Sequence, residues 1–341
     1  MSWKVPVRTE TARMVLPDGR RVERRVEVRT HPLTGDTVRV LTPPFRPLRI
    51  PDIRERYAHT RQGCPFCPGA VESITPRFDP DECDRPLVSR GQAKVFPNLL
   101  AYSGVCALTV VTEDHFVGIT EWEPAVILDA LLVARRFFRT VQTTRPDMAT
   151  RLIHWNYMPP SGSSMIHPHH QLMATATPPT RLARLAEGSR RMAGGGRPHP
   201  WDRIVESERE LGERWVGVLG PWSWMCDPAP QGRYFELVGV HERCWDLVDL
   251  EDEDLSALAQ GLCLVMSYLE SQGLWSFNLA LMGLPRAGGF FRCQARIVPR
   301  AFFPPAECSD IHFDVIEHEA MVLRSPEHAA REARAFFPDE G

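Results

Sequence analysis

Two stretches of the chain show the same order of structural signals, and this order constrains the fold most. In each, a segment with apolar residues at helical spacing is followed by a strand pattern, a turn rich in Pro or Gly, a second strand pattern and two prolines. The helical segments begin near residues 124 and 250, and Pro178 and Pro304 keep the same spacing. The pattern predicts a duplicated α+β unit of roughly 120 residues.

Hydrophobic periodicity and turn residues predict the individual elements. In the first unit we expect strands at 93–104, 106–116, 151–158 and 166–176 and a helix at 124–142. In the second we expect helices at 201–215 and 254–272 and strands at 215–226, 233–240, 275–283 and 290–300. The predicted organisation is an N-terminal extension at 1–28, a first unit at 29–179, a basic Gly-rich crossover at 180–200 and a second unit at 201–341.

Charge and composition exclude several classes of protein. The net charge of −3 gives no general attraction to nucleic acid or to an anionic membrane. No apolar run reaches the roughly 20 residues of a membrane span, and the segment MSWKVPVRTE lacks the apolar core of a secretory signal. Nine cysteines, an odd number with one close pair, favour reduced thiols. We therefore expect a cytoplasmic protein without nucleic-acid or membrane partners.

The segment SSMIHPHHQLMAT, residues 163–175, carries the strongest chemical signal. On a strand, His167, His169 and Gln171 point to one face. Imidazole there can ligate a metal, transfer a proton or act as a nucleophile, and the hydroxyls and N–H groups around Ser163 and Ser164 suit a phosphate. The alternative is a set of surface or hydrogen-bonded structural histidines.

The repeat predicts that this chemistry is confined to one unit. The shift between the units places Cys293 and Ala295 opposite His167 and His169. His170 points to the opposite face from His169 and is expected to serve packing or to face solvent.

A second signal is the pair Cys64 and Cys67 in GCPFCPG. Two thiolates at this spacing within a Gly/Pro turn can bind one tetrahedral zinc ion, with two ligands from elsewhere. The best donors are His115 and His167, near predicted strand ends. A redox motif is the alternative, but it normally opens a helix, which the surrounding prolines disfavour.

Taken together, these segments resemble the galactose-1-phosphate uridylyltransferase family of the histidine triad superfamily. The matching pieces run from about residue 29 to 335 and include HPLTGDTVRVLTP, GCPFCPG, VFPNLLA and GSSMIHPHHQ. The last is specific to the family, and the others gain weight from their order. The resemblance implies two fused histidine-triad-like units with antiparallel sheets and packed helices.

The resemblance also implies a mechanism. The second histidine of His-Pro-His, here His169, attacks the α-phosphate of a nucleotide sugar and forms a covalent nucleotidyl-histidine. A phosphorylated acceptor then takes the nucleotide by ping-pong chemistry. Gln171 and Ser164 would donate hydrogen bonds to the phosphoryl oxygens.

Further roles follow from the same resemblance. It implies a structural zinc ion on Cys64, Cys67, His115 and His167. It places the nucleotide and its phosphates near Asn98, Asn156, Ser163, Arg46 and Arg49, the two arginines matching with a one-residue shift. It also implies a homodimer, for which the residues themselves give no sign.

Departures from the family pattern concern the second metal and the sugar. Met165 and Ile166 replace its Asn-Pro. The family's iron site uses histidines of the C-terminal half, but none lies between His241 and His312, so no iron is expected. Glu317 and His318 stand where the family reads the hexose with Tyr-Glu. We therefore expect an acceptor other than galactose 1-phosphate in this region.

The leading hypothesis is a nucleotidyltransferase that acts on a nucleotide sugar or other nucleotide and a phosphorylated small molecule. A phosphorylase or hydrolase of the same superfamily, with orthophosphate or water as acceptor, is the second. A zinc-stabilised nucleotide-binding protein without turnover is the third.

Overall fold

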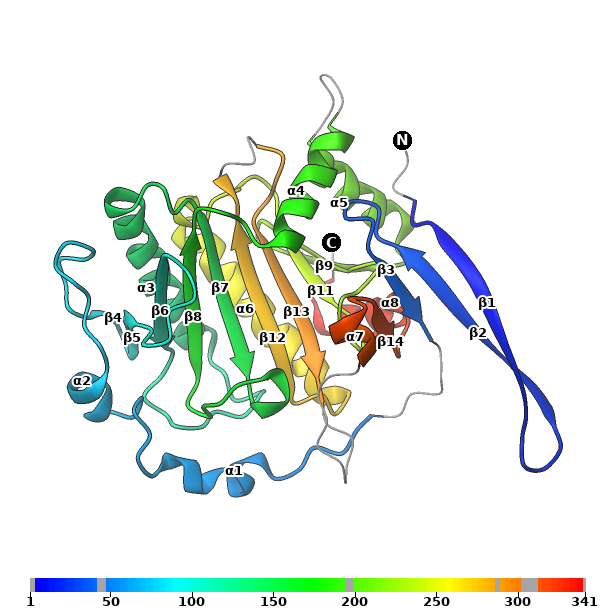
Figure 1. Ribbon diagram of the computed structural model, residues 1–341, viewed down its shortest axis with the longest axis horizontal. Helices are drawn as coiled ribbons and strands as arrows, with labels where there is room; N and C mark the ends of the chain where they lie inside the picture. The colour runs from blue at the N-terminus through cyan, green and yellow to red at the C-terminus, as the bar shows by residue number, and fades with distance from the viewer. Residues whose placement is uncertain (1–3, 42–46, 194–198, 286–288, 302–311, 340–341) are drawn as a thin grey trace.

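The computed structural model describes residues 4–41, 47–193, 199–285, 289–301 and 312–339. Its centre is a ten-stranded sheet in which every neighbouring pair is antiparallel (Figure 1). Across the sheet the strands are β4 (Val88–Arg90), β5 (Ala93–Pro97), β6 (Val105–Val110), β8 (His169–Thr175), β7 (Thr150–Tyr157), β12 (Ser276–Gly283), β13 (Gln294–Arg300), β11 (Leu237–His241), β10 (Trp222–Cys226) and β9 (Trp215–Leu219).

The order of these strands repeats about the junction between β7 and β12. The series β5, β6, β8, β7 on one side corresponds to β10, β11, β13, β12 on the other. Each half inserts one long helix at the same point, α3 (Pro124–Thr144) before β7 and α6 (Asp252–Ser271) before β12. The predicted fold class of two fused α+β units is thereby confirmed, whereas their division at residues 179 and 201 stays a prediction.

Helices α3 and α6 pack side by side against one face of the sheet and form the main core. Buried apolar side chains recur along α3 at the spacing of one helical face, among them Ile127, Leu131 and Phe138. They contact the inward-facing residues of the strands, including the buried indole of Trp155 on β7. No helix of the described residues is both long enough and apolar enough to cross a membrane.

The opposite face of the sheet is covered only in part. Helices α4 (Thr180–Met192) and α5 (Pro200–Leu211) lie over it, and Leu182, Leu185 and Ile204 pack against strand residues there. The residues 180–192, expected to form a linker or mobile crossover, are therefore helical. Their basic residues concealed an apolar stripe that the sheet buries.

The strand register corrects one comparison between the two units. Gln294 pairs with Met282 on β12 and lies on the face of the sheet that carries His169. Cys293 and Ala295, expected opposite His167 and His169, instead point to the helix-covered face, and both are fully buried. A one-residue offset in the repeat exchanges the two faces of a strand, which explains the error.

Strand β5 is shorter than the expected strand at 93–104. It ends at Pro97, and Asn98 begins a loop. The Asn98 Oδ1 accepts a hydrogen bond from the N–H of Leu100 at 3.0 Å. This local bond competes with strand pairing, as is usual for asparagine.

The N-terminal extension forms a hairpin that belongs to a second sheet. Strands β1 (Val7–Val15) and β2 (Arg21–Thr30) are joined by a turn at Asp18-Gly19 and extend away from the body of the molecule (Figure 1). Strand β2 also pairs with β3 (Thr37–Val40), which pairs in parallel with β14 (Ala320–Val322). The predicted boundary at residue 28 falls inside β2.

The shorter helices occupy the connections between these layers. They are α1 (Ile53–Arg56), α2 (Ala70–Ile74), α7 (His312–Ile316), α8 (Pro326–Ala333) and the 3-10 turns Ala58–Arg61, Pro159–Ser161, Leu247–Asp249 and Arg334–Phe336.

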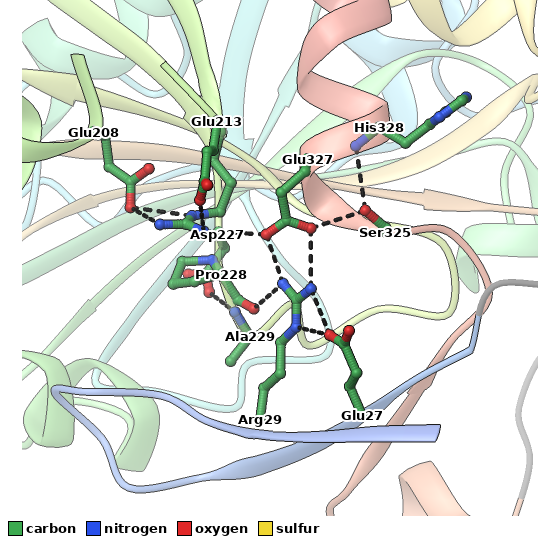
Figure 2. A network of polar contacts seen from close by, with 11 residues as sticks. Glu27, Arg29, Glu208, Glu213, Asp227, Pro228, Ala229, Ser325, Glu327 and His328 are labelled. Atoms are coloured by element: carbon green, nitrogen blue, oxygen red, sulfur yellow. Dashed lines mark hydrogen bonds and ion pairs between the residues drawn. The ribbon is translucent and has the colours of Figure 1, made fainter. Parts of the chain in front are cut away.

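A cluster of ion pairs ties strand β2 to helix α8 (Figure 2). The buried Arg29 guanidinium donates two hydrogen bonds to Glu327, at 2.8 and 3.0 Å. Glu327 also accepts a hydrogen bond from Arg214 at 3.1 Å, and Arg214 donates to the buried Glu208 of α5. The cluster therefore joins segments from both ends of the chain to α5.

The same contacts predict how stability responds to acid. Burial alone would raise the pKa of Glu327, but hydrogen bonds and charge from Arg29 outweigh it and lower the pKa from 4.5 to about 2. A depressed folded-state pKa contributes stability above the unfolded pKa, and this stability is lost as pH falls toward 2. We expect Glu327→Gln to cost about 3 kcal/mol at pH 7 and progressively less between pH 5 and 3.

Urea unfolding of both proteins at several pH values measures this difference, with the exposed Glu123→Gln as the matched control. An equal cost at pH 7 and pH 3 would contradict the assignment, because it would show that the carboxylate charge is not what stabilises the cluster.

Candidate metal centre and nucleophile site

The four residues proposed as metal ligands converge at one point. Their donor atoms, from Cys64, Cys67, His115 and His167, all lie within 4.8 Å of one another. The Cys67 Sγ lies 3.5 Å from His115 Nδ1 and 3.6 Å from His167 Nδ1, and the Cys64 Sγ lies 3.7 Å from His167 Nδ1. Ordinary tetrahedral zinc bonds hold sulfur and nitrogen ligands about 3.6 Å apart. The cluster therefore has the dimensions of a metal site.

The outer nitrogen of each histidine has a partner that fixes the ring. His167 Nε2 lies 2.8 Å from the carbonyl oxygen of Thr112, to which it must donate. His115 Nε2 lies 2.9 Å from the Thr60 hydroxyl, which itself donates to the carbonyl of Tyr57 and so accepts from the ring. Both rings thus carry hydrogen on Nε2 and turn the Nδ1 lone pair toward the thiols. This is the arrangement that metal-ligating histidines commonly show.

Burial favours uncharged ligands in the absence of a cation. It lowers the pKa of His167 to about 4 and also lowers that of His115. Burial, followed by the neighbouring Cys64, raises the pKa of Cys67 to about 11. A divalent cation displaces thiol protons and stabilises two thiolates at such a site. The donor set therefore fits a metal ion.

His169 lies on β8 two residues beyond the metal cluster, with its ring buried. Its Nδ1 is 2.9 Å from the carbonyl oxygen of His167. Because a carbonyl only accepts, Nδ1 carries the hydrogen and Nε2 keeps its lone pair. Burial lowers the pKa of His169, an effect that the bond to His167 partly offsets. The side chain is thus a neutral imidazole with a defined nucleophilic atom.

Phe66 connects the cysteine loop to this histidine. Its ring centroid lies 5.3 Å from that of His169, 6.2 Å from that of His167 and 5.7 Å from that of Phe96 on β5. The CPFC motif indicates a role for its two cysteines and none for the residues between them. The aromatic residue between them packs against the His169 ring and so links it to the cysteine loop.

The neighbouring strands bring polar groups to the same face as His169. Gln171 lies two residues along β8 and pairs with His154 on β7. Asn156 follows two residues later on β7, and its Oδ1 accepts a hydrogen bond from Asn278 Nδ2 at 2.8 Å. Asn278 belongs to β12, so the second half of the chain contributes to this face. His154 and Asn278 were not predicted, because only strand pairing brings them there.

The turn before β8 places the two serines differently. Gly162 has φ 88°, in the left-handed region that glycine favours, and ends the 3-10 turn Pro159–Ser161. Ser164 is exposed, whereas the buried Ser163 donates its hydroxyl hydrogen to the carbonyl of Met165 at 2.7 Å. Of the two predicted phosphate ligands, Ser164 is therefore the one with a solvent-facing side chain.

The remaining predicted residues are less closely associated with this face. Asn98 begins the loop that follows β5, the strand that pairs with β6. Arg49 is exposed in the segment before α1, and Arg46 lies outside the described residues. Glu317 and His318 are exposed between α7 and β14, beside the smaller sheet.

His170 points away from the site, as the strand alternation predicts. It is buried against Trp155, with ring centroids 4.8 Å apart, and burial lowers its pKa to about 3. It serves packing rather than facing solvent, and it lies on the face opposite His169.

Comparison with known proteins finds one sequence relative and several solved structures of similar fold. No protein-family model matches the chain. An uncharacterized protein of Archaeoglobus fulgidus is 30% identical over 326 residues, which cover 95% of this chain and 96% of that protein. A GalT-like protein of Arabidopsis thaliana superposes with a TM-score of 0.67 at 16% identity, over 90% of this chain and 98% of that one.

Two further solved structures are similar over nearly their whole length. An ADP-glucose phosphorylase of Arabidopsis thaliana with bound ADP-glucose has a TM-score of 0.66 at 15% identity. A uridylyltransferase has the same TM-score at 21% identity. Each comparison covers 91% of this chain and 98% of the other. The chain therefore belongs to one family with the Archaeoglobus protein, and it shares the fold of the GalT-like protein, the ADP-glucose phosphorylase and the uridylyltransferase.

Proposed function

We propose that the protein is a nucleotidyltransferase that carries a nucleoside monophosphate on His169. The observation that carries the proposal is the hydrogen bond from His169 Nδ1 to the carbonyl of His167, which leaves Nε2 as the free lone pair. A neutral imidazole is a good nucleophile near pH 7, and imidazolium is a good leaving group. Similarity of fold to a uridylyltransferase and to an ADP-glucose phosphorylase supports the same class of reaction.

In the first step, His169 Nε2 forms a bond to the α-phosphorus of the donor nucleotide. The bond from that phosphorus to the bridging oxygen breaks, and the leaving phosphate keeps the electron pair. The positive charge on the ring is shared with Nδ1–H, which the His167 carbonyl already accepts. In the second step an acceptor oxygen attacks the phosphorus, and the Nε2–P electron pair returns to the ring.

Other residues of the site face would bind the nucleotide. Gln171 and Ser164 would donate hydrogen bonds to phosphoryl oxygens, where negative charge increases in the transition state. We assign Asn98 and Asn156 to the nucleotide, Ser163 to the phosphate-binding turn, and Arg46 and Arg49 to the distal phosphate, for which guanidinium groups are suited. The acceptor would be phosphorylated, with Glu317 and His318 in the acceptor region.

The identity of the acceptor separates two versions of this proposal. The chain carries Glu317 and His318 in place of a hexose-reading Tyr-Glu pair, which favours an acceptor other than galactose 1-phosphate. Orthophosphate as acceptor would make the protein a phosphorylase. Incubation of the nucleotidylated protein with orthophosphate or with sugar phosphates, followed by product identification, distinguishes the two. A nucleotide-binding protein without turnover would form no product with either.

We further propose that the metal is zinc and that its role is structural. A set of two thiols and two imidazoles is the usual ligand set of closed, tetrahedral zinc sites. Cys64, Cys67, His115 and His167 would bind the ion through separate segments, so that the cysteine loop, the end of β6 and the start of β8 are held together. No iron is expected. A homodimer and a cytoplasmic location stay predictions.

The covalent intermediate provides the direct test. Intact-mass spectrometry after mixing with UDP-glucose, ADP-glucose, GDP-mannose or dinucleoside polyphosphates should show addition of one nucleoside monophosphate. His169→Ala should abolish this addition and turnover, because it removes the Nε2 lone pair that would form the bond to phosphorus. Gln171→Ala should slow transfer by about 100-fold, the usual effect of losing one preorganised donor.

His170→Ala is the matched control, because His170 is on the helix-covered face. It should keep the ability to form the adduct even if stability falls. Undiminished turnover by His169→Ala, or an adduct on another residue, would rule out the assignment.

The zinc assignment predicts metal content and stability together. Protein purified without chelator should hold about one zinc ion per chain, and Cys64→Ser should lose zinc and lower the unfolding temperature more than it alters the chemical step. Elemental analysis with thermal unfolding measures both. Absence of zinc from the wild-type protein would contradict the proposal.

The hydrogen bond between Thr60 and His115 fixes the imidazole ring. Its loss should weaken metal binding less than the loss of a ligand such as Cys64. Thr60→Val removes the hydroxyl that accepts from His115 Nε2 and should weaken zinc binding by about 10- to 100-fold. Thr144→Val is the matched control, because the Thr144 hydroxyl bonds a helix carbonyl far along the chain on α3. Competition with a chromogenic chelator compares the affinities. Equal weakening by both variants would contradict the assignment.

A further inference from the structure

The loop after β5 carries a residue that contacts the proposed machinery directly. Tyr102 lies in this loop, between the end of β5 at Pro97 and the start of β6 at Val105. Its hydroxyl donates a 2.8 Å hydrogen bond to the Oε1 of Gln171 on β8. Tyr102 is an exposed aromatic residue of this loop, yet its hydroxyl is turned toward the sheet. Neither the histidine segment nor the cysteine pair indicates a role for this tyrosine.

A chain of polar contacts holds this hydroxyl in place. The Asn98 amide donates to the Cys106 Sγ at 3.6 Å, and the Asn98 Oδ1 accepts from the N–H of Leu100 at the start of the loop. Cys106 in turn interacts with the Tyr102 hydroxyl. Burial, with a contribution from Cys106, raises the pKa of Tyr102 to about 12. The phenol is therefore protonated, and acts as a donor, throughout the range in which the protein would work.

The direction of this bond determines which end of the Gln171 amide is occupied. A tyrosine hydroxyl that donates to Oε1 leaves the two hydrogens of Nε2 for another partner. Within the part of the chain that the structure describes, Gln171 makes no other side-chain hydrogen bond. Gln171 and His169 share one face of β8, so the free N–H groups and the His169 Nε2 border the same space.

We propose that Tyr102 is a positioning residue for nucleotidyl transfer, which fixes the Gln171 amide with its N–H groups available to the phosphoryl oxygens. This inference rests on the proposed function. Without the tyrosine, the amide can rotate about its terminal torsion, which has two broad minima, and present its oxygen to the phosphate instead. An oxygen there repels the phosphoryl group. The interaction strengthens as charge develops on phosphorus, so the effect belongs to the transition state.

The test uses single-turnover formation of the nucleotidyl-protein with the donor that modifies the wild-type protein. Tyr102→Phe removes only the hydroxyl and should slow this step by about 3- to 10-fold, the usual effect of one hydrogen bond, with the concentration for half-maximal rate nearly unchanged. Leu100→Ala, an exposed residue of the same loop, is the matched control and should leave the rate unchanged.

A double-mutant cycle distinguishes positioning from direct contact. If Tyr102 acts through Gln171, then Tyr102→Phe should have no further effect in the Gln171→Ala protein. Multiplicative effects of the two substitutions would overturn the inference, because they would show that the hydroxyl acts independently. A wild-type rate for Tyr102→Phe would overturn it as well.

The failure of this inference differs from the failure of the proposed function. Absence of any adduct on wild-type His169, with every donor, would contradict the function itself. A normal His169 adduct in the wild type, together with either of the two results above, would contradict the role of Tyr102 alone. An equal slowing by Leu100→Ala would also contradict it, because loop integrity would then explain the loss.

Discussion

The hydrogen bond from His169 Nδ1 to the carbonyl oxygen of His167 is the interaction on which the site depends. The backbone of His167 thereby fixes the tautomer of His169. The ring of His167 itself belongs to the candidate metal cluster. Phe66, between the two cysteines, packs against both rings. A metal ion held by the four ligands would therefore act on the chemistry only indirectly, by keeping this backbone and this aromatic ring in place.

The two halves of the sheet use their equivalent faces differently. In the first half, the face around His169 carries groups with free donors and a free lone pair. In the second, Arg296 is buried with Asp227 and Glu236, at 2.7 Å from each, and it also donates to Gln294. Burial alone would raise the pKa of Asp227, but the neighbouring His31 and arginines lower it. On this face of the second half, the buried charged groups are thus paired with one another.

Much of the fold and the site followed from the sequence, because local signals were strong there. Helical periodicity identified the segment from Pro124, strand alternation placed His169 and Gln171 on one face, and the CPFC turn indicated a metal loop. The helix at 180–192 was missed because its charged residues outweighed a narrow apolar stripe. The offset at Gln294 was missed because alternation makes a one-residue shift reverse the faces. Tyr102, Thr60 and Asn278 have no motif, and only the tertiary fold brings them to the site.

The most direct measurement identifies which ring nitrogen of His169 carries phosphorus in the nucleotidylated protein. Heteronuclear NMR on the ¹⁵N-histidine-labelled, nucleotidylated protein can distinguish a phosphoramidate at Nε2 from one at Nδ1 through the coupling between nitrogen and phosphorus. Because the His167 carbonyl occupies Nδ1–H, the account predicts linkage at Nε2 of His169. Linkage at Nδ1, or phosphorus on any other residue, would contradict it.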